Sequence, residues 1–174
     1  MKQFVLSALL LGFVVSASAD PLASLTTLPA EAHYGVAWGQ SVTTPNGGPW
    51  NNIHFNFIDQ DHNDFAIGGL YLLTQPYTGT PADLNSSVAG YLGFTDTIDN
   101  GIWEFSNVTL NPATQYFFYM DTVGGTAALL WPTGDHYTGG DAAGSGGPGT
   151  FALVSGADML FVLTGDPVAA APEP

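Results

Sequence analysis

Short runs rich in aromatic and β-branched residues recur along this chain after residue 20, and Gly, Pro, Asn and Asp separate them. In one run Ile53, Phe55 and Phe57 alternate with His54 and Asn56, which is the period of a strand that buries one face. No run has the 3.6-residue period of an amphipathic helix. The 174 residues, with 22 Gly and 12 Pro, are therefore predicted to form one all-β domain.

We expect about eight strands joined by turns in which Gly and Pro set the backbone conformation. The candidate strands are Tyr34–Val42, Ile53–Asp59, Ile67–Thr74, Val88–Thr95, Ile102–Leu110, Gln115–Asp121, Ala127–Trp131 and Met159–Thr164. Tyr116–Met120 is apolar on both faces, which indicates a central strand. The Gly-rich stretch Gly139–Thr150 is predicted to be a long surface loop that leads into the last strand.

One turn element indicates the kind of β architecture. Leu110–Tyr116 has the sequence Leu-Asn-Pro-Ala-Thr-Gln-Tyr and resembles the L-x-P-x-T-x-Y element of fibronectin-type sandwiches. In such sandwiches the Tyr hydroxyl hydrogen-bonds back to the turn as a tyrosine corner. We therefore predict an antiparallel β-sandwich of the jelly-roll or Greek-key kind, with Tyr116 as the corner residue.

The first 19 residues have the organisation of a secretory signal peptide. Met1–Gln3 is a short positive region, Phe4–Val15 is apolar, and Ala17-Ser18-Ala19 is an A-x-A cleavage site. The apolar run is too short to span a bilayer core of about 30 Å. We therefore predict a signal peptide at 1–19 and a secreted β-sandwich ectodomain at 20–165.

The charge of the mature chain limits its partners. Lys2 is the only Lys or Arg, so its removal moves the formal net charge from -14 to -15 and leaves 15 acidic residues without a cationic side chain. Binding to nucleic acid needs cations that neutralise phosphates, and binding to anionic membranes needs a basic patch. Neither partner is expected. The absence of Cys also excludes a disulfide framework.

A cluster of oxygen-bearing side chains suggests a Ca²⁺ site. Asp59, Asp61, Asn63 and Asp64 are spaced as at the start of a D-x-D-x-N calcium loop. The match is incomplete, because Asp64 stands where the EF-hand needs Gly and Leu70 stands where a bidentate Glu closes the site. The alternative is a solvated hairpin tip, so Ca²⁺ is a candidate cofactor only.

Motifs for catalysis are weak in this sequence. The histidines lack the HExxH spacing of a zinc site, and His62 beside the acidic cluster is the one plausible metal ligand. Glu104 is the internal Glu with aromatic neighbours, and it would be the candidate acid of a hydrolase. We expect no enzymatic activity.

Two tryptophans are candidates for contact with carbohydrate. Trp50 and Trp131 each lie next to a Pro in a turn region, so we expect them nearest the surface. Exposed aromatic rings stack against sugar rings, although core packing also explains aromatic residues of this kind.

The end of the sequence resembles a known sorting signal. Pro172-Glu173-Pro174 follows a short Ala/Pro spacer and is similar to the opening of the tail of PEP-CTERM exported proteins of Gram-negative bacteria. A hydrophobic helix and an Arg cluster follow that tripeptide in the family, whereas this sequence stops at Pro174. The signal peptide, the scarcity of cations and the absence of Cys are similar to that family, as are the segments Gly69–Leu73, Tyr77–Pro81, Tyr137–Gly140 and Asp158–Gly165.

The resemblance implies delivery to the cell surface, processing by an exosortase-type enzyme, and association with exopolysaccharide and biofilm matrix. Residues 166–174 are then a linker and the start of the sorting motif. We predict an exported, non-enzymatic surface or matrix protein. The alternative is a calcium-assisted carbohydrate-binding module that uses the Asp59–Asp64 turn and exposed aromatic rings.

Overall fold

The computed structural model describes residues 21–27, 30–33, 36–59, 64–121, 129–132, 134–146 and 149–169. The first sheet contains, in spatial order, β1 (Pro21–Leu25), β14 (Phe161–Pro167), β4 (Trp50–Ile58), β9 (Ile102–Phe105) and β8 (Ile98–Asp99), and β5 (Asp64–Phe65) pairs with β4. The second sheet contains β13 (Ala152–Val154), β12 (Ala142–Gly146), β3 (Val36–Thr43), β10 (Gln115–Met120), β6 (Leu70–Leu73) and β7 (Tyr91–Thr95). A separate ribbon pairs β2 (Ala30–His33) with β11 (Leu129–Pro132), and one 3-10 turn, η1, covers Pro81–Asp83.

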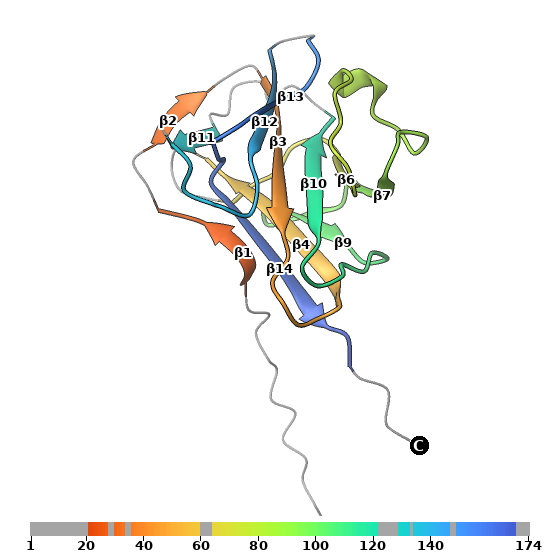
Figure 1. Cartoon of the computed structure of the whole chain (residues 1–174). Coiled ribbons are helices and arrows are strands. Elements are labelled where there is room, and N and C mark those ends of the chain that lie inside the picture. Colours follow the sequence, from red (N-terminus) through yellow and green to blue (C-terminus); the bar gives the residue numbers. More distant parts are fainter. Residues whose placement is uncertain are drawn as a thin grey trace, which may run out of the picture.

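All neighbouring strands are antiparallel, and the two main sheets pack against each other (Figure 1). The predicted all-β antiparallel sandwich is confirmed. The described segments contain no helix with the length and hydropathy needed to cross a membrane.

Aromatic rings fill the space between the sheets. Phe55 of β4 stacks on Phe118 of β10, with ring centroids 4.2 Å apart and planes within 10°. The ring of Phe161 of β14 is also nearly parallel to that of Phe55, with centroids 5.9 Å apart and planes within 12°. Trp103 of β9 is fully buried, and its indole Nε1 donates to the carbonyl of Gly68 at 3.0 Å. The alternation found in the sequence therefore places one face of each of these strands in a shared core.

A smaller apolar cluster covers the outer face of the second sheet. Phe117 and Tyr119 of β10 pack there with Phe151 and with Leu84 of the segment that links β6 to β7. The Tyr119 hydroxyl accepts a hydrogen bond from the Tyr77 backbone N–H at 3.0 Å. Because β10 is buried on both faces and lies between β3 and β6, the prediction of a central strand is confirmed.

The tyrosine corner is also confirmed. The hydroxyl of Tyr116 accepts a hydrogen bond from the backbone N–H of Asn111 at 2.8 Å, five residues upstream. Thr44 supports the same turn, because its Oγ1 donates to the Asn111 carbonyl at 2.6 Å. The corner thus ties the turn before β10 to the end of β3.

The prediction of a long loop at Gly139–Thr150 is wrong, because Ala142–Gly146 forms β12 inside the second sheet. Small side chains make this possible. A Cβ atom at Gly140 would lie 1.9 Å from the Ser41 carbonyl oxygen, so a larger residue would push the segment away from β3. The short strand β13 then pairs with β12 and forms the edge of the sheet.

Other boundaries also differ from the prediction. The expected strand Val88–Thr95 begins only at Tyr91, and Ile102–Leu110 ends at Phe105 because the chain turns there. At the C-terminal end, β14 runs to Pro167, two residues beyond the predicted domain boundary at 165.

Candidate functional site

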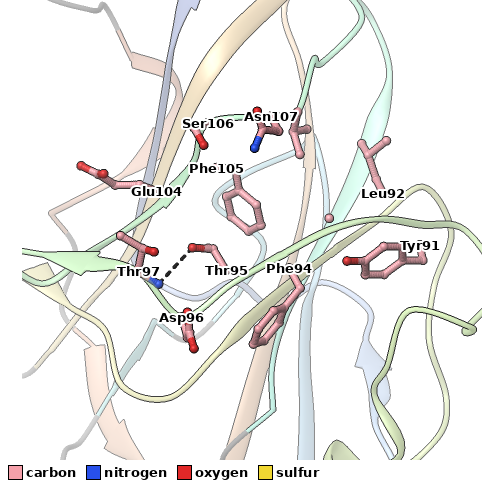
Figure 2. Close-up of a pocket in the computed structure, with 12 residues that line it drawn as sticks. Tyr91, Leu92, Phe94, Thr95, Asp96, Thr97, Glu104, Phe105, Ser106 and Asn107 are labelled. Carbon is pink, nitrogen blue, oxygen red and sulfur yellow. Dashed lines mark hydrogen bonds between the residues drawn. The ribbon is translucent and has the colours of Figure 1, made fainter.

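An open groove of about 350 Å³ lies between β7, at the edge of the second sheet, and β9 of the first sheet (Figure 2). β8 pairs with β9 at Ile102 and Trp103, and the Glu104 backbone N–H donates to the Thr97 carbonyl at 3.2 Å. Tyr91–Thr95 line one side of the groove, and residues 105–108 line the other. The groove therefore lies at the side of the sandwich where the chain passes from β7 of the second sheet into β8 of the first.

The base of the groove is apolar. Phe105 and Val108 are buried and belong to the main core. Gly93 of β7 faces them so closely that a Cβ atom there would lie 2.8 Å from Cγ2 of Val108. A glycine is needed at this position because β7 approaches the loop after β9 without room for a side chain.

The rim of the groove carries hydroxyl, amide and carboxylate groups. Asp96, Thr97, Ser106 and Asn107 are exposed along it, and Glu104 is half-buried. Thr95 is held inward, where its Oγ1 accepts a hydrogen bond from the Thr97 backbone N–H at 3.1 Å (Figure 2). The rim thus offers neutral hydrogen-bonding groups and negative charge, and a ligand that fits it is neutral or cationic.

Aromatic rings form a shelf beside the groove on the outer face of β6 and β7. The ring centroid of Phe94 lies 4.6 Å from that of Tyr71, and Tyr91 lies 6.3 Å from Tyr71. Phe94 is 40% exposed. It lies over Gly69, where a Cβ atom would come within 2.2 Å of its ring. Burial raises the pKa of the Tyr71 hydroxyl, and the nearby Asp121 carboxylate and Tyr91 raise it further, so this phenol stays protonated and able to donate.

The expectation that Trp50 lies at the surface is wrong. Its side chain is only 5% exposed. The turn before β4 folds over the indole, and a Cβ atom at Gly48 would lie 2.5 Å from the ring. The backbone of Trp50 also pairs with Leu110 in both directions. The turn therefore covers the ring, and Trp50 is not available to a sugar. Trp131 lies in β11 opposite Glu31, and the prediction for its side chain is not tested.

The candidate calcium cluster is only partly described. Asp61 and Asn63, together with His62, lie outside the described residues. Asp59 is half-buried and directly follows β4. Asp64 belongs to β5, and its backbone pairs with that of Ile58 in β4. Among the residues that the structure describes, no three His, Asp or Glu side chains gather as a metal site would require. The Ca²⁺ site remains a prediction.

Glu104, the candidate acid of a hydrolase, lies at the groove. Its ladder partner in β4 is His54. Figure 2 shows its side chain directed away from the ring of Phe105. The groove contains a second carboxylate, Asp96, and the residues that line it include no histidine.

One buried acid, Asp158, is not among the site residues predicted from the sequence. Its carboxylate accepts hydrogen bonds from the backbone N–H groups of His136 at 2.9 Å and Tyr137 at 2.8 Å, and from Gln40 Nε2 at 3.3 Å. The Gln40 side-chain carbonyl in turn accepts the backbone N–H of Met159 at 2.8 Å. Burial raises the pKa of Asp158, and these hydrogen bonds oppose that shift. The cluster holds the segment before β12 against β3, and it is structural.

Of the residues that line the groove only Glu104 was a candidate from the sequence, and the others were missed for a different reason. Tyr91 and Phe94 lie one and four positions after an ordinary Ala-Gly turn, and nothing in their spacing shows that β7 is an edge strand. Comparison of this chain with protein-family models, with curated proteins and with solved structures finds no match. The features of the molecule that bear on its function are therefore a polar groove beside exposed aromatic rings and the absence of Lys and Arg after Lys2.

Proposed function

We propose that this chain is an exported, non-enzymatic domain of the cell surface or extracellular matrix. The observation that carries the proposal is the charge: 15 acidic residues and no Lys or Arg after residue 2. A surface whose charges are all negative keeps neighbouring copies soluble, and it does not attract nucleic acid or anionic lipid. Such a protein suits a hydrated matrix of polysaccharide outside the cell.

The position of the first strand is compatible with export. β1 begins at Pro21, so cleavage after Ala19 would leave all described strands intact. Pro21 pairs with Thr164 of β14, and the described chain therefore enters and leaves at the same end of the sandwich (Figure 1). The proposed sorting residues Pro172, Glu173 and Pro174 lie outside the described residues. In this proposal an exosortase-type enzyme is the processing partner, and exopolysaccharide is the surrounding material.

Expression of the full-length gene in a Gram-negative host tests the export. We expect an extracellular product whose first residue is Asp20, because the A-x-A site directs cleavage after Ala19. Trypsin should leave this product uncut even when it is heat-unfolded, since no Lys or Arg remains. Chymotrypsin, which cuts after aromatic residues, is the matched control for unfolding. Intact chain in the cytosol with residues 1–19 retained would refute the proposal.

A second candidate function, binding of carbohydrate, is favoured by the exposed rings beside the groove. Tyr91 and Phe94 can stack on sugar faces while the hydroxyl and amide groups of the rim bind sugar hydroxyls. Because the rim carries acids and no cation, the ligand would be a neutral or amino-bearing glycan. Ca²⁺ held at the Asp59–Asp64 turn would assist this binding in the calcium-dependent version of the proposal.

A glycan array followed by titration of any bound glycan tests this candidate. Phe94→Ala should weaken binding about tenfold, which corresponds to about 1.4 kcal/mol. Val168→Ala is the matched control, because Val168 is equally exposed and lies far from the groove in the sequence. Repeating the titration with a chelator tests the calcium part separately. Equal affinity of Phe94→Ala and wild type would dismiss the groove as the sugar site.

A further inference from the structure

The second sheet is free of charge, in contrast to the rest of this acidic chain. Its six strands contain no Asp, Glu, Lys, Arg or His, whereas strands of the first sheet contain Asp64, Asp99, Glu104 and Asp166. Sheets that must avoid pairing with other molecules commonly place charged side chains on their edge strands. Neither edge strand of this sheet, β7 or β13, has that protection.

The exposed apolar side chains concentrate on the same two edges. Six large apolar residues are exposed in the described part of the chain, and four of them lie on β7 or β13: Tyr91, Phe94, Leu153 and Val154. Exposed apolar side chains on an unpaired edge favour association with another strand.

A single cross-strand row joins the two edges. In the ladder Leu153 pairs with Ala143, Ala143 with Gly39, Gly39 with Tyr119, Tyr119 with Tyr71, and Tyr71 with Phe94. Directly paired residues point to the same face of a sheet. Leu153, which is 42% exposed, and Phe94 therefore end one row and lie on the same outer face.

The strand directions allow the row to continue into a second copy. Each of the six strands is antiparallel to its neighbour, so β13 and β7 run in opposite directions. A second copy displaced along the sheet, without being turned over, would bring its β13 antiparallel to β7 of the first. The lengths also match, because β13 has three residues and β7 has three regularly paired residues, Gly93–Thr95, beyond its bulge.

We propose that copies of this domain associate head to tail, with β13 of one copy pairing with β7 of the next to extend the second sheet from molecule to molecule. In this arrangement Leu153 of one copy packs beside Phe94 of its neighbour. Because the two paired surfaces are different and the copies are related by displacement along the sheet without a closing rotation, the assembly stays open and grows into a chain of domains.

Charge favours this arrangement over a two-fold dimer through β7. The groove beside β7 is lined by Asp96, which follows β7, and by Glu104 of β9, and Asp99 lies in β8, the next strand of the chain. A two-fold axis would bring these acids of two copies together, and like charges repel. The segment 142–157, which contains β12 and β13, has no charged residue. When the uncharged β13 edge of one copy meets the acidic β7 edge of the next, that repulsion is avoided.

The net charge gives the assembly a characteristic salt dependence. Copies of formal charge -15 repel at long range, whereas the proposed contact consists of backbone hydrogen bonds and apolar side chains. Assembly should therefore strengthen from about 0.01 M to about 1 M salt, as the Debye length falls from about 30 Å to about 3 Å. An interface held by ion pairs would weaken over the same range.

This inference goes beyond the proposed export and does not depend on it, because purified protein beginning at Asp20 retains all described strands. Sedimentation velocity at rising protein concentration should show a series of oligomers without a fixed final size. Leu153→Glu would bury an unpaired charge at the joint and should raise the concentration needed for assembly at least about tenfold. Val168→Glu is the matched control, since it adds the same charge at a residue that is 40% exposed, close to the 42% of Leu153, and it should assemble as the wild type does.

Mixing two edge variants gives the sharpest test. Phe94→Glu blocks β7 but keeps β13, and Leu153→Glu blocks β13 but keeps β7. Each should be monomeric alone, and an equimolar mixture should form a dimer and nothing larger, because one intact joint remains. Tyr91→Glu replaces Phe94→Glu if thermal melting shows that the latter is unfolded. A wild type that stays monomeric at high salt, a closed dimer, or assembly unchanged by Leu153→Glu would each overturn the proposal.

Discussion

Asp158→Ala is expected to lower the free energy of unfolding by about 3–5 kcal/mol, because it leaves one buried and two partly buried donors without an acceptor at once. The backbone N–H groups of His136 and Tyr137 and the Nε2 of Gln40 all donate to this carboxylate. A buried donor that loses its partner costs about 1–3 kcal/mol. Chemical denaturation followed by tryptophan fluorescence measures the loss. A change below about 1 kcal/mol would show that the segment before β12 is not held by this carboxylate.

Asp158→Asn is the matched control, and it also tests the ionisation of Asp158. Burial raises the pKa of this carboxyl above its ordinary value of 3.8. The folded state therefore binds the proton more tightly than the unfolded state, and stability falls as the pH rises from the unfolded pKa through the folded pKa. Asn cannot titrate, so its free energy of unfolding should fall less than that of the wild type over this window. Equal slopes for the two proteins would contradict the raised pKa.

The parts of the fold that were predictable from the sequence have a period or a motif. Ile53, Phe55 and Phe57 alternate with polar residues, and the structure places them in the buried strand β4. The Pro-Ala-Thr-Gln-Tyr element predicted the corner at Tyr116 correctly, because its hydroxyl needs a backbone donor at a fixed distance along the turn. In both cases the information lies within a few consecutive residues.

β12 was missed because its residues have neither a period nor a β-forming side chain. Ala142, Ala143 and Gly144 are small, and their strand conformation depends on a partner, β3, that lies about 100 residues earlier in the chain. Small residues are required there because β3 approaches closely, as at Gly140. A pattern read within a window of residues contains no information on such a long-range contact.

The candidate site was hidden for the same physical reason. The groove exists because β7 and β9, which belong to different sheets, lie side by side at this edge of the sandwich. Trp50 is the opposite case, a residue expected at the surface that is buried. The proline beside it suggested a surface turn, but that turn covers the ring. Exposure of an aromatic side chain therefore depends on which strand forms the edge of a sheet, and strand order is a property of the whole chain.

Phe118→Ala is expected to lower the free energy of unfolding by about 3–5 kcal/mol, the range for removing a buried Phe side chain. Phe118 is fully buried at the centre of β10, and its ring stacks on Phe55 of the opposite sheet at 4.2 Å. It also contacts Phe105 edge-on, at 6.3 Å. The substitution therefore removes contacts between the sheets and leaves a cavity where they pack most closely. For a domain of about 150 residues the melting temperature should fall by roughly 6–20 °C.

Two variants show whether this loss comes from packing between the sheets. Phe118→Leu keeps most of the apolar volume and should lose less than half as much stability as Phe118→Ala, because the remaining cavity is smaller. Phe94→Ala, measured at low protein concentration, removes the same atoms from an exposed ring and should cost less than about 1 kcal/mol. If Phe118→Ala and Phe94→Ala cost the same, the two sheets are not held together by the aromatic stack, because a ring between the sheets would then contribute no more than a ring on the surface.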